Sequence, residues 1–169
     1  MNERFTSPVC YADEANDVYM GYLNQDEVIR LLGDLMLASR AIARAALTLI
    51  VDAGPEWSSF LATLHRVETR WSRQLRLAVT HMGAVPPPDV DDIYEHIMRL
   101  ADPIDRFAAT RDALQCVVAE LDALVSRIRD ETHREWLRVL RADLRAFIAQ
   151  VDRLLAPPLG GAQTSPITG

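Results

Sequence analysis

The chain has 169 residues, of which 49% are hydrophobic, 25% are charged and only 7 are glycines. This composition is typical of a single helical domain with one core. The formal net charge of −6 disfavours sequence-independent binding of nucleic acid, because such binding depends on a basic surface. All 18 basic residues are arginines, which we attribute to a GC-rich genome. No segment resembles a membrane span or a signal peptide, so we expect a cytoplasmic protein.

Both ends of the chain differ in composition from its middle. Residues 1–23 lack a sustained period and predict an irregular arm. We expect the arm to be ordered against the folded domain, because its Tyr side chains can lie on a helical surface. Residues 157–169 are rich in Pro, Gly, Ser and Thr and predict a disordered tail. The folded domain is therefore expected to span residues 24–156.

Within this domain, apolar side chains recur with helical spacing over four long segments, residues 24–51, 56–82, 104–128 and 131–156. Asn24 and Glu27 form a capping-box pattern at the start of the first segment, and Gly54 and Pro55 end it. Each amphipathic segment of this length must bury one face against the others. The pattern therefore predicts an all-α four-helix bundle.

The connection between the second and third long helices contains an additional short helical pattern. Three prolines at residues 86–88 form a stiff connector, and residues 89–101 follow with apolar side chains on one helix face. This connection is long enough to return along the bundle, as the crossover of ferritin-like folds does. A plain up-down bundle with a decorated loop is the alternative.

Each long helix carries one polar or charged residue in the middle of its apolar face, and these are Ser39, Glu68, Arg111 and Asp143. A buried carboxylate without a partner is too costly to keep, so Glu68 and Asp143 are predicted to share Arg111. Arg40 and Arg44 on the first helix are the substitute partners. The preferred interpretation is a buried ionic network that fixes helix register. A polar ligand pocket and a single-metal site are the alternatives.

Four short motifs carry a resemblance to a known family. They are Ser-Pro-Val-Cys at residues 7–10, Tyr-Met-Gly at residues 19–21, Ser-Arg-Ala at residues 39–41, and His-Arg-Val-Glu-Thr-Arg-Trp at residues 65–71. Together they resemble an uncharacterised bacterial family of small helical proteins related to the ferritin-like superfamily, from about Ser7 to Ile148. The resemblance implies a ferritin-like four-helix bundle and brings no activity with it.

The wider ferritin resemblance would imply a di-iron site made of inward glutamates and Glu-x-x-His motifs. The ligand set is degenerate here. Ser39 takes the place of one glutamate, and Trp71 stands three residues after Glu68, where the histidine would be. The remaining mid-bundle positions are held by Leu114, Val118, Asp143 and Ala146.

We therefore expect no cofactor and a non-catalytic binding or interaction protein, either a homodimer or a protein that binds another protein. The alternative is a metal-binding protein or oxidoreductase that holds iron or manganese at a reduced site around His65, Glu68 and Asp143.

The remaining polar candidates have plainer interpretations. His65 lies at the edge of the apolar stripe, which favours a solvent-facing or capping role. Cys10 and Cys116 lack a Cys-x-x-Cys partner and are expected to be reduced thiols. Two arginine stripes opposite the apolar faces are expected to be solvated, one with Arg66, Arg70 and Arg73, and the other with Arg134, Arg138, Arg141 and Arg145.

Overall fold

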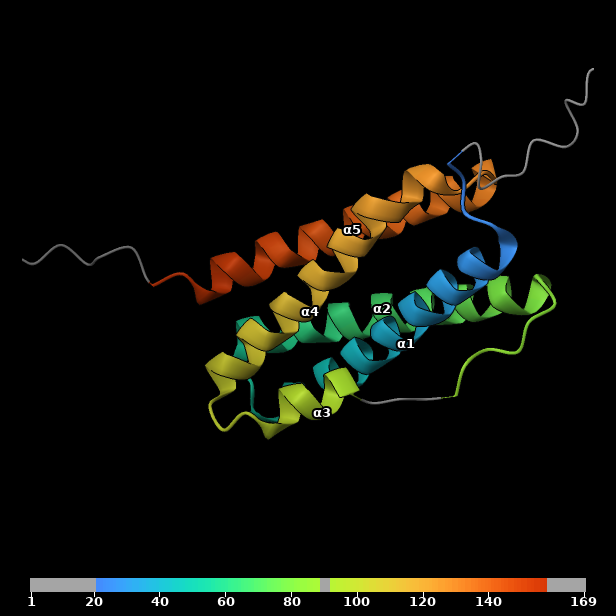
Figure 1. The fold of residues 1–169 in the computed structure, drawn as a ribbon. Coiled ribbons are helices and arrows are strands. Elements are labelled where there is room, and N and C mark those ends of the chain that lie inside the picture. The colour runs from blue at the N-terminus through green and yellow to red at the C-terminus, as the bar shows by residue number, and fades with distance from the viewer. Residues whose placement is uncertain (1–20, 89–91, 158–169) are drawn as a thin grey trace, which may run out of the picture.

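The computed structural model describes residues 21–88 and 92–157, and its regular elements are helices. Four are long, namely α1 (Gln25–Leu49), α2 (Pro55–His81), α4 (Pro103–Leu124) and α5 (Glu131–Leu155) (Figure 1). A short helix, α3 (Asp92–Arg99), lies between α2 and α4 in the chain. The 3-10 turns η2 (Ile50–Asp52) and η3 (Val125–Arg127) follow α1 and α4. The predicted all-α architecture with an extra short helix is confirmed.

Local sequence signals set the helix ends close to the predicted positions. The Asn24 side chain accepts a hydrogen bond from the Glu27 backbone at 2.9 Å, and the Asn24 backbone N–H donates to the Glu27 carboxylate at 2.8 Å. This is the predicted capping box. Pro55 is the first residue of α2, where its missing N–H removes no helical bond. Gly83 follows α2 with φ of +82°, a conformation that glycine adopts readily.

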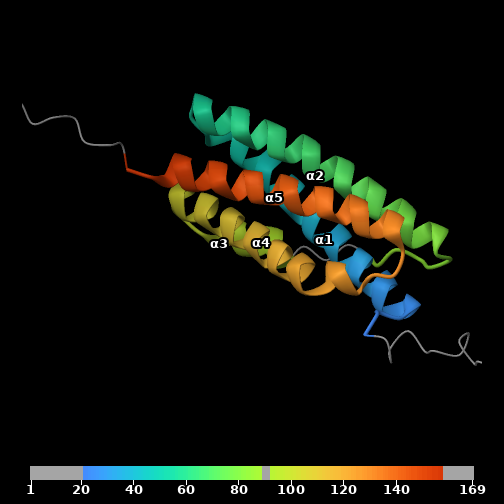
Figure 2. The same ribbon diagram turned by 90° about the horizontal axis from the view of Figure 1, so that it is seen from above.

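The long helices pack as two pairs, α1 on α2 and α4 on α5. Both views show that α2 and α4 run in the same direction, whereas α1 and α5 run in the opposite one (Figures 1 and 2). The pairs meet through α1 on α4 and α2 on α5, and α3 packs on α1 and α4. Each long helix therefore has two antiparallel neighbours. The chain leaves α2 at one end of the bundle and enters α4 at the other.

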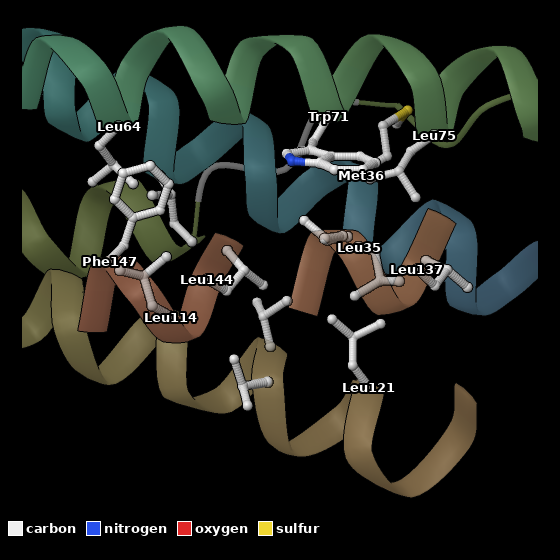
Figure 3. Packing of buried hydrophobic residues seen from close by; sticks show 14 of the residues in the cluster. Leu35, Met36, Leu64, Trp71, Leu75, Leu114, Leu121, Leu137, Leu144 and Phe147 are labelled. Atoms are coloured by element: carbon white, nitrogen blue, oxygen red, sulfur yellow. The ribbon is translucent and has the colours of Figure 1, made fainter. Parts of the chain in front are cut away.

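The hydrophobic core fills the space between the two helix pairs. In Figure 3, Trp71 and Leu75 of α2, Leu35 of α1, Leu121 of α4 and Leu137 of α5 converge on this space, and all five side chains are buried. Burial of such side chains contributes about 1.5–3 kcal/mol each and is the main source of stability. No helix among residues 21–88 and 92–157 has the length and apolarity to cross a membrane.

Two of the four polar residues predicted for the apolar faces lie at the edges of those faces. The side chains of Arg111 and Asp143 are 30% and 34% exposed, while their neighbours Thr110 and Leu144 are buried. Apolar residues on one face of a helix can be three or four residues apart. The sequence pattern alone therefore does not decide whether Thr110 or Arg111, and Asp143 or Leu144, faces the core. The helix buries the side chain that is cheaper to desolvate. The Thr110 hydroxyl meets its hydrogen-bonding need by donating to the Arg106 carbonyl at 2.9 Å.

Gly33 allows the segment that follows α2 to lie against α1. A β-carbon at Gly33 would lie 3.2 Å from Cγ and 3.3 Å from Cδ of Pro87, closer than ordinary contact. Pro87 belongs to the predicted proline connector. The small residue on α1 therefore fixes where the returning chain crosses that helix.

The described end of the N-terminal arm is tied to η3. The Leu23 backbone N–H donates to the Arg127 carbonyl at 2.8 Å, and Arg127 Nε donates to the Gly21 carbonyl at 3.1 Å. Leu23 is also buried in the core. The expectations for the rest of the arm and for the tail, residues 1–20 and 158–169, lie outside the described residues.

Candidate functional site

Glu68, in the middle of α2, is completely buried. Among the described residues neither of its carboxyl oxygens has a hydrogen-bond partner of ordinary geometry. Loss of hydration raises the pKa of Glu68 from 4.5 to about 7; the nearby Ser39 hydroxyl of α1 opposes this rise, and the negative charge of Asp143 adds to it. The carboxyl group is therefore partly protonated near neutral pH, which lowers the cost of burying it.

Asp143 of α5 is held by two donors from α2. Trp71 Nε1 donates to Asp143 Oδ2 at 3.0 Å, and Arg70 Nη2 lies 3.4 Å from the same oxygen. Trp71 is buried and stacks on Trp136 of α5, with ring centroids 6.1 Å apart. The tryptophan that stands where a metal-binding histidine would be expected thus binds a carboxylate through its indole N–H. This bond links the two helix pairs.

The prediction that an arginine neutralises Glu68 is wrong. Arg111 instead pairs with its neighbour Asp112 at 2.8 Å and with Asp152 of α5 at 3.5 Å. Both pairs lie on the outside of the α4–α5 hairpin, where a guanidinium keeps its hydration. Only an ionised Glu68 requires an arginine partner, and the raised pKa of Glu68 removes that requirement.

The substitute arginines lie outside the buried cluster as well. Arg40 and Arg44 are exposed on α1. The Arg44 guanidinium lies 4.1 Å from the ring centroid of Tyr94 on α3, in a cation–π arrangement. The structure therefore brings together Ser39, Glu68, Trp71 and Asp143 from the predicted set and leaves the three arginines on the surface.

His65 does not complete a metal site. Its Nδ1–H donates to the Ala43 carbonyl of α1 at 2.9 Å, which fixes the ring against the neighbouring helix. Within residues 21–88 and 92–157, no three His, Cys, Asp or Glu side chains converge as metal ligands would. Of the candidates for a reduced metal site, Glu68 and Asp143 influence each other, and His65 is engaged elsewhere.

A cavity of about 520 Å³ opens between α1, α3 and α4, with a lining separate from the Glu68 cluster. Its floor is made of small and aliphatic side chains, namely Ala38, Ile93, Ile97, Ala109, Ala113 and Val117. Its rim is polar and mostly acidic, with Asp34, Asp92, Asp112, Glu120, His96 and Cys116. The volume lies in the range of sites for small organic molecules.

The carboxylates of this rim interact across the helices. Partial burial is the main cause that raises the pKa of Glu120 on α4, and the charge of Asp34 on α1 raises it further while Arg30 opposes the shift. Asp34 and Glu120 therefore repel each other at the edge of the cavity. A cation placed between them would relieve this repulsion.

The sequence alone did not predict this cavity. The local signal is a pair of small residues, Ala109 and Ala113, one helical turn apart on α4, together with Asp112 and Glu120 on the same helix. That pattern is common on solvated helices, and the cavity exists only because α3 packs on α1 and α4. The tertiary arrangement, rather than the local pattern, creates the site.

The fold and these sites define an all-α protein of two paired helical hairpins, with a polar cluster in its core and an acid-rimmed cavity at its side. The chain belongs to the family described as Domain of unknown function (DUF6306), whose model matches residues 26–153. The match runs from the first turn of α1 to the last turn of α5. No curated protein and no solved structure matches the chain. The predicted membership of an uncharacterised helical family is thus confirmed at this level.

Proposed function

We propose that this protein is a non-catalytic binding protein with a ferritin-like bundle, and that its ligand is a small organic cation bound in the cavity between α1, α3 and α4. One observation carries the proposal. An apolar floor lies beneath two mutually repelling carboxylates, Asp34 and Glu120, in a space of about 520 Å³. Apolar walls with a few convergent polar groups are the usual features of a small-molecule site.

The ferritin-like part of the proposal is supported by helix direction. Two antiparallel pairs with a parallel α2 and α4 are what a crossover between the second and third long helices produces (Figure 1). Ser39, Glu68 and Asp143 occupy the mid-bundle positions at which a dimetal centre would be held. In this protein the Trp71–Asp143 hydrogen bond and the buried Glu68 carboxyl replace that centre.

The rim and floor define the chemistry of the ligand. An ammonium group between Asp34 and Glu120 would gain charge-assisted hydrogen bonds from both helices. Asp112 contributes less, because Arg111 already pairs with it at 2.8 Å. An alkyl or aryl body would cover Ala109, Ala113 and the other floor residues, which favours binding through apolar burial.

Calorimetric titration with a hydrophobic primary amine and with the neutral alcohol of the same skeleton tests this proposal. We expect the amine to bind at least about tenfold more tightly than the alcohol. Glu120→Gln and Asp34→Asn should each weaken amine binding by roughly tenfold and leave alcohol binding unchanged. Asp52→Asn, which removes an exposed carboxylate outside the cavity, is the control. Equal affinity for amine and alcohol, or binding of neither, would contradict the proposal.

Cys116 provides a second readout, because its exposed thiol lies on the cavity rim. A bound amine should slow the alkylation of Cys116 by iodoacetamide, as measured by peptide mass spectrometry. Alkylation of Cys10, the other cysteine of the chain, serves as the internal reference. An unchanged ratio of the two rates at saturating amine would place the ligand elsewhere.

A reduced metal site is the second candidate function, and one observation favours it. The buried carboxyl oxygens of Glu68 lack hydrogen-bond partners, and Asp143 is close enough to affect the pKa of Glu68. A cation bound by these two carboxylates would neutralise the negative charge of both. Metal analysis of protein purified under reducing conditions tests this candidate. Near-stoichiometric iron or manganese that is lost in Glu68→Gln would support it.

A further inference from the structure

The outer face of the α1–α2 hairpin is basic along its middle. Between residues 35 and 51, and again between residues 57 and 81, the sequence contains one acidic residue, the buried Glu68. The exposed basic residues of the same stretches are Arg40, Arg44, Arg66, Arg70, Arg73 and Arg76. We call this surface the arginine face. Such segregation in a chain of net charge −6 creates a local positive potential that favours an anion.

A groove of about 380 Å³ lies on the arginine face between α1 and α2. Arg40 and Arg44 line it from α1, and Arg73 lines it from α2. The hydroxyl-bearing residues Thr69 and Ser72 of α2 line the same groove. Guanidinium groups from two helices together with hydroxyl donors suit the oxygens of a phosphate group, which accept several hydrogen bonds at once.

A second groove, of about 460 Å³, adjoins the first and extends the arginine face along α2. His65, Thr69 and Arg73 line both grooves and are spaced one helical turn apart. Arg66 and Arg70 line the second groove alone. A ligand in the first groove therefore contacts residues of α2 that also line the second groove, next to the positive charges of Arg66 and Arg70.

Several contacts hold this surface in place. The Nδ1–H of His65 is bound to the Ala43 carbonyl, which leaves Nε2 as the ring nitrogen available to the grooves. Arg70 is bound to Asp143 at 3.4 Å, so it contributes to the second groove with part of its charge compensated. For Arg66 and Arg73, the described residues provide no ion pair. The arginine face thus combines fixed groups with the uncompensated positive charge of Arg66 and Arg73.

We propose that the groove between α1 and α2 binds the phosphate group of a small phosphorylated molecule. Arg40 and Arg73 grip the phosphate from opposite helices, and Thr69 and Ser72 donate hydroxyl hydrogen bonds to it. The groove volume is that of a small-molecule site. An extended nucleic acid fits less well, because the acidic remainder of the chain would repel it. This site is separate from the acid-rimmed cavity and does not depend on the cation proposed there.

Calorimetric titration of the full chain with pyrophosphate tests the proposal. We expect Arg40→Gln and Arg73→Gln each to weaken pyrophosphate binding by about tenfold or more. Arg153→Gln is the matched control, because it removes the same charge from an exposed position on α5, away from the arginine face. It should change the affinity by less than about twofold. All three arginines are exposed, so the variants are expected to fold, and circular dichroism checks this.

Three results would overturn the proposal. The first is no pyrophosphate binding at millimolar concentration. The second is an equal loss of affinity in Arg40→Gln, Arg73→Gln and Arg153→Gln, which would show a response to net charge alone. The third is tight, salt-sensitive binding of an RNA oligonucleotide without pyrophosphate binding, which would make the partner a polyanion.

Discussion

At the scale of single residues, Glu68 determines how the middle of the bundle must be understood. A buried glutamate was expected to bring an arginine with it, and none of the predicted arginines reaches it. The carboxyl group instead has a raised pKa of about 7, with Ser39 as its polar neighbour on α1. A group of this kind makes the stability of the folded protein depend on pH.

Glu68 is therefore expected to stabilise the fold at low pH and to lose that effect as the pH rises. The folded pKa of about 7 lies above the unfolded value of 4.5, so the contribution is fully present below pH 4.5 and is lost between pH 4.5 and 7. Relative to Glu68→Gln, the wild-type free energy of unfolding should fall by about 3 kcal/mol across this window. Urea unfolding of both proteins at pH 4.5 and pH 8 measures this difference. A difference independent of pH would show that Glu68 is ionised and compensated.

Trp71 is expected to stabilise the protein through its indole N–H as well as through its burial. Trp71→Phe removes the 3.0 Å bond to Asp143 and should lower the free energy of unfolding by about 1.5–3 kcal/mol beyond the effect of lost ring atoms. Trp136→Phe is the control, because it replaces the indole that stacks on Trp71 with a smaller ring. Denaturant unfolding compares the two variants. Equal losses would mean that the hydrogen bond to Asp143 contributes nothing.

At the scale of helices, the sequence predicted the existence and approximate ends of the five described α-helices, but not the 3-10 turns η2 and η3. The capping box at Asn24 and Pro55 at the start of α2 are local signals, so they could be found without the fold. The sequence predicted less well how α4 and α5 are rotated about their own axes, and hence which of their residues face the core. Arg111 and Asp143 fit the apolar stripes by spacing, but Thr110 and Leu144 are cheaper to bury and take the core positions.

Gly33 is expected to be required for the packing of the connection after α2 against α1. Gly33→Leu would place a side chain where Pro87 lies 3.2 Å from the position of a β-carbon. We expect a loss of about 1–3 kcal/mol in the free energy of unfolding, despite the better helix propensity of leucine. Ala149→Leu, at an exposed position of α5, should have little effect. A neutral or stabilising Gly33→Leu would show that the connection is free to move away.

At the scale of the whole molecule, local patterns could not predict the directions of the helices, the acid-rimmed cavity or the two grooves of the arginine face. The length of the connection allowed a crossover or an up-down bundle, and only the packed arrangement distinguishes them (Figure 2). The cavity depends on α3 lying against α1 and α4, and the arginine face depends on α1 and α2 lying side by side. The core residues, in contrast, follow from amphipathic spacing in each helix.

Parallel titrations with a hydrophobic amine and with ferrous iron under anaerobic conditions distinguish an organic ligand from a metal most directly. Ala113→Phe fills the cavity floor, and Glu68→Gln alters the mid-bundle carboxyl without touching the cavity lining. We expect one amine to bind per chain, with binding abolished by Ala113→Phe and preserved in Glu68→Gln. Stoichiometric iron binding that is lost in Glu68→Gln and kept in Ala113→Phe, together with no amine binding, would contradict the proposed function.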